Sequence, residues 1–173
     1  DGKALAVYGA GKPAWHGLGT VVEGVLTPEE AMRLAGTDFI VKTAPVFAKV
    51  DDKLVEIEGQ RATYRSDIGE VLGIVSDKYR PIQNITPMQL LGEIVRTKEA
   101  GIVAHAALNK GERLFAVLDL AALKNIRIPG DPSRHDAYLV AQWWHSGEGA
   151  FTIGPSMVRV ECQNMANAQI TYA

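Results

Sequence analysis

The sequence has little cysteine, little net charge and no long apolar run. A single cysteine in 173 residues excludes an internal disulfide framework and favours a reducing compartment, so we expect a cytoplasmic protein. The 18 basic and 20 acidic residues leave a net charge of −2. This excludes an overall positive charge that would attract nucleic acid or anionic lipid to the whole protein. No apolar run approaches the roughly 20 residues of a membrane helix, so no membrane partner is expected.

What remains is the composition of an ordinary globular domain. Hydrophobic residues make up 47% of the chain and charged residues 22%. The order of the patterns predicts one α+β domain, in which antiparallel β-meanders pack with a few helices. We expect residues 1–26 to form a Gly-rich N-terminal arm. Residues 27–173 are expected to form the core, cut short before a further C-terminal portion.

Two segments carry helix-start signals. Thr27 and Glu30 form a capping box around a proline at the first helical position, and Gly36 ends that short helix. The same signal at Thr86, followed by apolar residues at helical spacing, predicts a second helix that runs to about Lys98.

Segments rich in β-branched and aromatic residues predict the strands. The first meander is expected from the segments Phe39–Val50, Leu54–Ile57, Ala62–Ser66 and Val71–Ser76. The second set is expected from Ile102–Leu108, Leu114–Leu118, Ala137–Trp144, Ala150–Ile153 and Met157–Cys162. Asn109-Lys110-Gly111 is predicted to be a hairpin turn with glycine at a positive φ.

No cofactor and no metal are predicted. Gly9-Ala10-Gly11 follows an apolar run, as in a dinucleotide-binding turn, but Pro13 and the next glycines prevent the helix which that turn requires. The chain has four histidines, and none is spaced from another as metal ligands on one helix turn would be.

Cys162, His145 and Asn164 are the residue types of a thiol nucleophile, its base and an orienting group. Cys162 alternates with Val158 and Val160 on a predicted strand, which favours a small buried side chain. A cysteine-dependent enzyme is therefore an alternative, and we favour a non-catalytic protein. Rapid alkylation of the thiol would distinguish the two.

Basic and aromatic residues are interleaved, as in proteins that hold single strands by stacking and cationic contacts. Phosphate contacts are expected from Arg65, Lys78, Arg80, Arg113 and Arg159, and base stacking or groove lining from Trp15, Tyr79 and Trp144. The alternative is a set of solvated charges, because most of these cations have an acidic residue nearby in the sequence.

Several motifs together resemble a known family. They are Trp15-His16-Gly17-Leu18-Gly19, residues 27–39, Tyr64-Arg65-Ser66-Asp67, Leu72-Gly73-Ile74-Val75-Ser76, Tyr79-Arg80-Pro81-Ile82-Gln83-Asn84, His145-Ser146-Gly147 and Arg159-Val160-Glu161-Cys162-Gln163-Asn164. The chain resembles the phage/plasmid-like proteins called domain of unknown function 932. It departs from their pattern at Ser146, where Asp is common, and at Met165, where Thr is common.

The resemblance implies a phage, prophage or plasmid origin and a bacterial host, without an established activity. The order of elements is also similar to the core of single-strand annealing recombinases. We therefore hypothesise a homo-oligomeric protein that binds single-stranded DNA and could anneal strands. The alternative is a structural protein that assembles through exposed sheet edges and binds no nucleic acid.

Overall fold

The computed structural model describes residues 6–8, 20–21, 26–97, 100–120, 127, 129–130 and 135–159, of which 6–8, 20–21, 135 and 157–159 are described by their backbone alone. The α-helices are α1 (Pro28–Ala35) and α2 (Ile85–Thr97), and η1 (Asn109–Gly111) is a short 3₁₀ helix. The strands are β1 (Ala6–Tyr8), β2 (Thr20–Val21), β3 (Val41–Val50), β4 (Lys53–Arg65), β5 (Val71–Ser76), β6 (Ala100–Leu108), β7 (Arg113–Leu120), β8 (His135–Trp144) and β9 (Thr152–Arg159).

The strands form two sheets. The large sheet has the order β2-β1-β6-β7-β8-β9, and the small sheet has the order β3-β4-β5. Neighbouring strands are antiparallel in both sheets, except that β1 and β2 are parallel. The predicted α+β class is confirmed. β1 and β2 come from the predicted N-terminal arm, and most of that arm lies outside the described residues.

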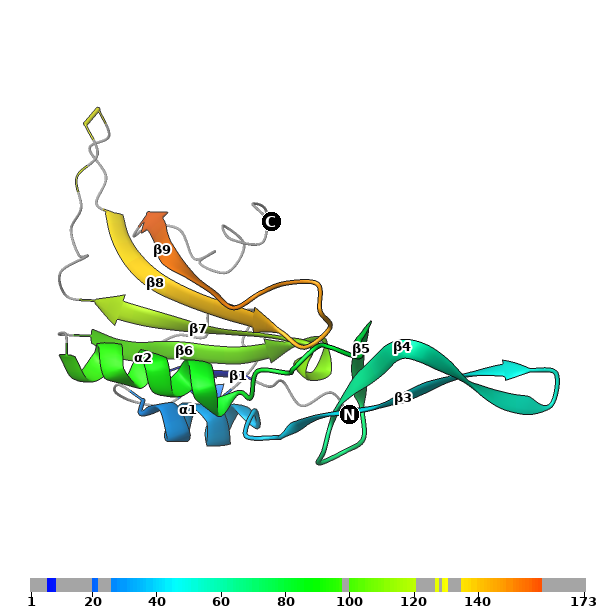
Figure 1. Ribbon diagram of the computed structural model, residues 1–173. Coiled ribbons are helices and arrows are strands. Elements are labelled where there is room, and N and C mark those ends of the chain that lie inside the picture. Colours follow the sequence, from blue (N-terminus) through cyan, green and yellow to red (C-terminus); the bar gives the residue numbers. More distant parts are fainter. Residues whose placement is uncertain are drawn as a thin grey trace.

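The core lies between the two helices and one face of the large sheet. α1 and α2 pack against each other and against β6 (Figure 1). Helix α1 begins with the predicted capping box, because Glu30 N–H donates to the Thr27 hydroxyl and Thr27 N–H donates to the Glu30 carboxylate. The main buried cluster consists of Leu26, Ala31, Met32, Ala35, Met88, Leu91, Ile102, Leu114, Ala116, Leu118, Ala141 and Trp143.

The prediction of four strands between residues 39 and 76 is wrong. β4 is one strand of 13 residues, although two strands were expected in its place. Gly59 takes a φ of 75° inside it, and the register shifts at this point: Pro45 pairs with Arg61 and Phe47 with Glu56, so the extra residues lie in β4. Glycine bends the strand here and does not end it.

The prediction of two separate strands after residue 149 is also wrong. One strand, β9, replaces them and pairs with β8, with Pro155 opposite Leu139. β9 is the last strand of the large sheet in the described part of the chain. An outermost strand tolerates proline because the side that lacks an N–H can face away from the neighbouring strand.

The small sheet contacts the large sheet through the turn that follows β8. The Thr63 hydroxyl donates to the His145 carbonyl at 2.7 Å, and His145 N–H donates to the Glu112 carbonyl at 2.7 Å. A Cβ at Gly73 would lie 2.4 Å from Cα of Ser146. Glycine at position 73 therefore allows the turn to lie directly on β5.

No helix in the described part of the chain combines the length and the apolar character that a bilayer crossing requires.

Candidate nucleic-acid interface

Arg65, an expected phosphate contact, is buried, with 6% of its side chain exposed. Its Nε and Nη2 donate to the two carboxylate oxygens of Asp67 at 3.1 and 2.7 Å, and its Nη1 donates to the Lys110 carbonyl at 2.8 Å. The guanidinium also lies 4.0 Å from the ring centroid of Phe39. Hydrogen bonding from Arg65 lowers the pKa of Asp67. The expected phosphate contact is therefore replaced by a structural role.

Replacing Arg65 with alanine is expected to lower the free energy of unfolding by about 2 kcal/mol, because three hydrogen bonds and the contact with Phe39 are lost. Asp67 is 43% exposed, so water can solvate the carboxylate that remains. Urea denaturation measures the loss. The Asp67→Asn variant keeps an acceptor for Arg65, so its free energy of unfolding should fall by less. A change below about 0.5 kcal/mol in Arg65→Ala would contradict this role.

Arg113 and Trp144, two other expected site residues, are in contact. They are paired across β7 and β8, and the Arg113 guanidinium lies 4.8 Å from the indole centroid. A Cβ at Gly149 would lie 2.6 Å from Cδ2 and Cε3 of Trp144, so the turn backbone rests against the same indole. Trp144 thus packs against both Arg113 and the turn. These contacts reduce the ring surface that is available for stacking on a base.

The Arg113 guanidinium has few partners. Its Nη2 donates to Oε1 of Gln142, and its Nε has no hydrogen-bond partner in the described part of the chain. None of the salt bridges formed by the described residues includes Arg113. Arg113 is therefore a half-buried positive charge, held in place by an aromatic ring and not neutralised by a carboxylate in that part of the chain.

Lys78, Tyr79 and Arg80 lie in the turn that connects β5 to the segment before α2. The Tyr79 hydroxyl donates to the Trp144 carbonyl at 3.2 Å, which joins this turn to the end of β8. Burial raises the pKa of Tyr79. Lys78 and Arg80 are exposed, and Arg80 donates only to backbone carbonyls among the described groups. The structure therefore brings five of the eight expected residues to one end of the large sheet.

Of the three remaining expected residues, Arg65 is buried as described above, and Trp15 and the side chain of Arg159 lie outside the description. Arg159 is paired with His135 at the opposite end of β8 from Trp144, and the 10 residues of β8 span about 30 Å. The side chain of Arg159 is outside the description, so only the position of its backbone is known.

Sequence reasoning missed a buried polar network centred on Asn84. Oδ1 of Asn84 accepts from Nε1 of Trp143 at 3.0 Å and contacts Nε2 of His145 at 2.7 Å. Nδ2 of Asn84 donates to the Thr37 carbonyl at 2.8 Å. The Thr37 hydroxyl lies 2.7 Å from Nε2 of His105. The network therefore connects the ends of α1 and α2 to β6 and β8.

The hydrogen bonds determine the tautomers of both histidines. The Trp143 indole can only donate, so the atom of Asn84 that it contacts must be the carbonyl oxygen, and Nε2 of His145 must donate to that oxygen as well. Nδ1 of His105 contacts the Phe115 carbonyl at 2.8 Å and must donate, which leaves Nε2 to accept from Thr37. Both imidazoles are neutral, and burial lowers the pKa of each to about 4.

The only sequence signal for the network was the pair Gln83-Asn84 directly before α2. Gln83 bonds the backbone of Val41 twice, with its Oε1 accepting from N–H and its Nε2 donating to the carbonyl, both at 3.0 Å. Two adjacent amides at a helix start are typical of local capping. Nothing in the spacing indicated that these amides contact β3 and the two histidine-bearing strands.

The structure describes only one of the three residues in the alternative hypothesis of a cysteine-dependent enzyme. His145 is fully buried and donates to Asn84, whereas Cys162 and Asn164 are outside the described residues. Among the residues that are described, no group of three or more His, Cys, Asp or Glu side chains could hold a metal ion.

The comparisons with known proteins identify one family. The model of the family described as Domain of unknown function (DUF932) matches residues 71–171, more than half of the chain. The match extends from β5 through α2 and β6–β9. Neither a curated protein nor a solved structure shows significant similarity to the chain.

Proposed function

We propose that this chain, which belongs to the family described as Domain of unknown function (DUF932), binds single-stranded DNA without catalysing a reaction. The observation that supports this most is the Arg113 guanidinium, fixed against Trp144 with most of its donors unpaired in the described structure. Exposed Lys78 and Arg80 lie on the adjoining turn. We further propose a bacterial cytoplasm as its location, a phage, prophage or plasmid as its source, and strand annealing as the process it serves.

The arrangement suits a flexible single strand better than a duplex. The cations lie beside rings at the junction of two sheets, and no described helix presents a row of basic side chains that would fit a major groove. Three phosphate contacts would give a slope of log K against log salt of about −2 for a single strand. Binding should therefore weaken clearly as salt is raised from about 50 to 200 mM.

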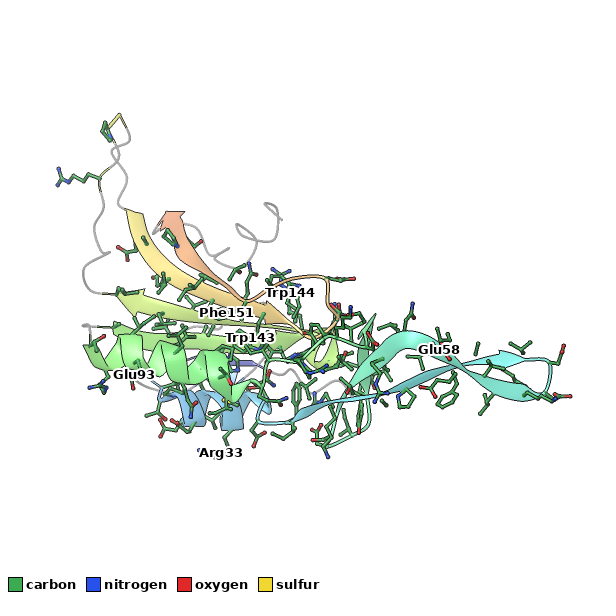
Figure 2. The ribbon with its side chains drawn as sticks, in the orientation of Figure 1. Arg33, Glu58, Glu93, Trp143, Trp144 and Phe151 are labelled. Atoms are coloured by element: carbon green, nitrogen blue, oxygen red, sulfur yellow. The ribbon has the colours of Figure 1, made fainter. Side chains whose placement is uncertain are left out.

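The Arg113→Ala variant is expected to bind a labelled oligothymidylate roughly tenfold more weakly at low salt, and its salt slope should be smaller by about 0.7. Fluorescence anisotropy measures both quantities. Arg33→Ala is the matched control, since it removes the same charge from an exposed position on α1, in the helical layer (Figure 2). Equal affinities for the wild type and Arg113→Ala, or no binding by the wild type at low salt, would refute the proposal.

A second candidate function is self-assembly without nucleic acid. Exposed apolar side chains on the small sheet favour it, among them Phe47, Leu54 and Ile74, which are 51%, 72% and 49% exposed. Light scattering with and without oligonucleotide distinguishes the candidates. Assembly that is unchanged by DNA favours the structural function, and assembly that depends on DNA favours the first proposal.

A further inference from the structure

Gln142 provides the only hydrogen-bond acceptor for the Arg113 side chain in the described part of the chain. Nη2 of Arg113 donates to Oε1 of Gln142 at 2.6 Å. A guanidinium can only donate, so the amide atom that it contacts must be the carbonyl oxygen. The amide nitrogen Nε2 of Gln142 then carries two donors, and it has no hydrogen-bond partner among the described residues. Gln142 therefore holds Arg113 and keeps free donors of its own.

The two side chains lie on the face of the large sheet that is turned away from the helices. Leu114 and Trp143 belong to the core cluster that packs with α1 and α2. Because side chains alternate along a strand, their neighbours Arg113, Gln142 and Trp144 point to the opposite face. Trp144 is directly opposite Arg113 on the adjacent strand, and Gln142 is one diagonal position away, within reach of a long side chain.

The Arg113–Gln142 pair offers donors to a ligand. Nη1 of Arg113 and Nε2 of Gln142 are unpaired in the described structure, and neither is among the buried atoms that lack a partner, so both are accessible to solvent. Oε1 of Gln142, the acceptor of the pair, is already used by Arg113. A ligand that suits the pair is therefore rich in acceptors. The two nonbridging oxygens of a phosphodiester only accept, and they meet this requirement.

A nucleobase suits the pair less well than a phosphate. The Watson–Crick edge of each base carries at least one N–H group, which needs an acceptor that the pair does not offer. Stacking is also restricted, because the Trp144 ring already has the Arg113 guanidinium 4.8 Å from its centroid and the backbone of Gly149 against it. The chemistry of this corner therefore favours the backbone of a strand.

Gln142 also leaves the charge of Arg113 available. A carboxylate at position 142 would accept the same hydrogen bond, but it would neutralise the guanidinium and reduce its attraction for phosphate. A neutral amide fixes the guanidinium without this cost. The side chain of residue 142 thus determines both the position and the effective charge of Arg113.

We propose that Gln142 is a further phosphate-binding residue, which holds one backbone phosphate of the strand together with Arg113. This inference rests on the proposed binding of single-stranded DNA, and it specifies the part of the strand that is held at this corner. Nη1 of Arg113 and Nε2 of Gln142 donate to the nonbridging oxygens. Since phosphates are the same in every sequence, the contact carries no base preference.

The test compares Gln142→Glu with Gln142→Met by fluorescence anisotropy on labelled oligothymidylate and oligodeoxyadenylate. Glutamate keeps the acceptor for Arg113 but loses the amide donors and neutralises the guanidinium. It should weaken binding of both oligonucleotides roughly tenfold at low salt, and the slope of log K against log salt should be smaller by about 0.7. Methionine leaves the charge of Arg113 in place, so it should weaken binding only about threefold, with an unchanged salt slope.

A purely structural role of Gln142 predicts the reverse order, because glutamate preserves the hydrogen bond to Arg113 and methionine removes it. Gln142→Glu should be as stable in urea as the wild type, since its carboxylate gains an ion pair. Gln89→Glu is the matched control, because it makes the same change at an exposed position on α2 and should bind like the wild type.

Four results would overturn this inference while the proposed function stands. They are wild-type affinity in Gln142→Glu, a larger loss in Gln142→Met than in Gln142→Glu, a loss confined to one of the two oligonucleotides, and a clear loss of stability in Gln142→Glu. Absence of binding by the wild-type protein at low salt would remove both the proposed function and the inference.

Discussion

The Asn84→Ala variant should lose about 4 kcal/mol of stability. The substitution leaves the indole N–H of Trp143, Nε2–H of His145 and the Thr37 carbonyl without partners. Each buried polar group without a partner costs about 1–3 kcal/mol. Urea denaturation followed by tryptophan fluorescence measures the change.

Gln89→Ala is the control for this prediction. Gln89 is an exposed amide on α2, so its loss should change the free energy of unfolding by less than about 0.5 kcal/mol. Asn84→Asp should also be strongly destabilising, because it brings a charge into the interior and removes the donor to Thr37. If Asn84→Ala were no less stable than Gln89→Ala, the network would have no structural role.

Lowering the pH from 7 to 5 should cost about 4 kcal/mol through His105 and His145. Burial holds each pKa at about 4, below the ordinary value of 6.5 that the unfolded chain restores. Below pH 6.5 the unfolded state therefore binds protons that the folded state does not, and stability falls as pH falls. The loss is about 2 kcal/mol for each histidine at pH 5 and stops growing below pH 4.

This pH range separates the histidines from the carboxylates. Hydrogen bonds from Arg65 and from Thr27 lower the pKa values of Asp67 and Glu30, so their contributions are lost only at more acid pH. Urea midpoints measured from pH 7 to 4.5 test the prediction, with NMR titration of the imidazole Cε1–H signals as the second readout. Constant stability down to pH 5, or assigned His105 and His145 signals that titrate near pH 6.5 in the folded protein, would show that these two rings are not buried and neutral.

Local signals predicted the helices and most strand positions well. The capping box at Thr27 and the turn at Asn109–Gly111 both form as expected, with Gly111 at a φ of 114°. Such signals depend on residues a few positions apart, which the sequence displays directly. The errors at Gly59 and Pro155 have one cause. Glycine and proline disfavour strands locally, and pairing with a neighbouring strand overrode that preference at both positions.

The candidate site was predicted less completely. Arg113, Trp144 and Tyr79 were selected because cations and rings alternate along the chain, and the structure brings them together. Arg65 was selected by the same rule and is buried against Asp67 and Phe39. Residue type alone does not distinguish an arginine that faces a ligand from one that holds two segments together, because both need the same planar set of donors.

The sequence by itself determined the α+β class, the positions of both helices and the near-neutral charge, because composition and short-range spacing control these properties. The tertiary structure decided which described cations remain without carboxylate partners among the described residues, the neutral state of the two histidines, and the exposure of apolar side chains such as Ile74 on the small sheet. Those features depend on the burial and pairing of residues far apart in the chain, such as Asn84 with His145 and Thr63 with the turn after β8. Contacts of this kind form only when the two sheets meet.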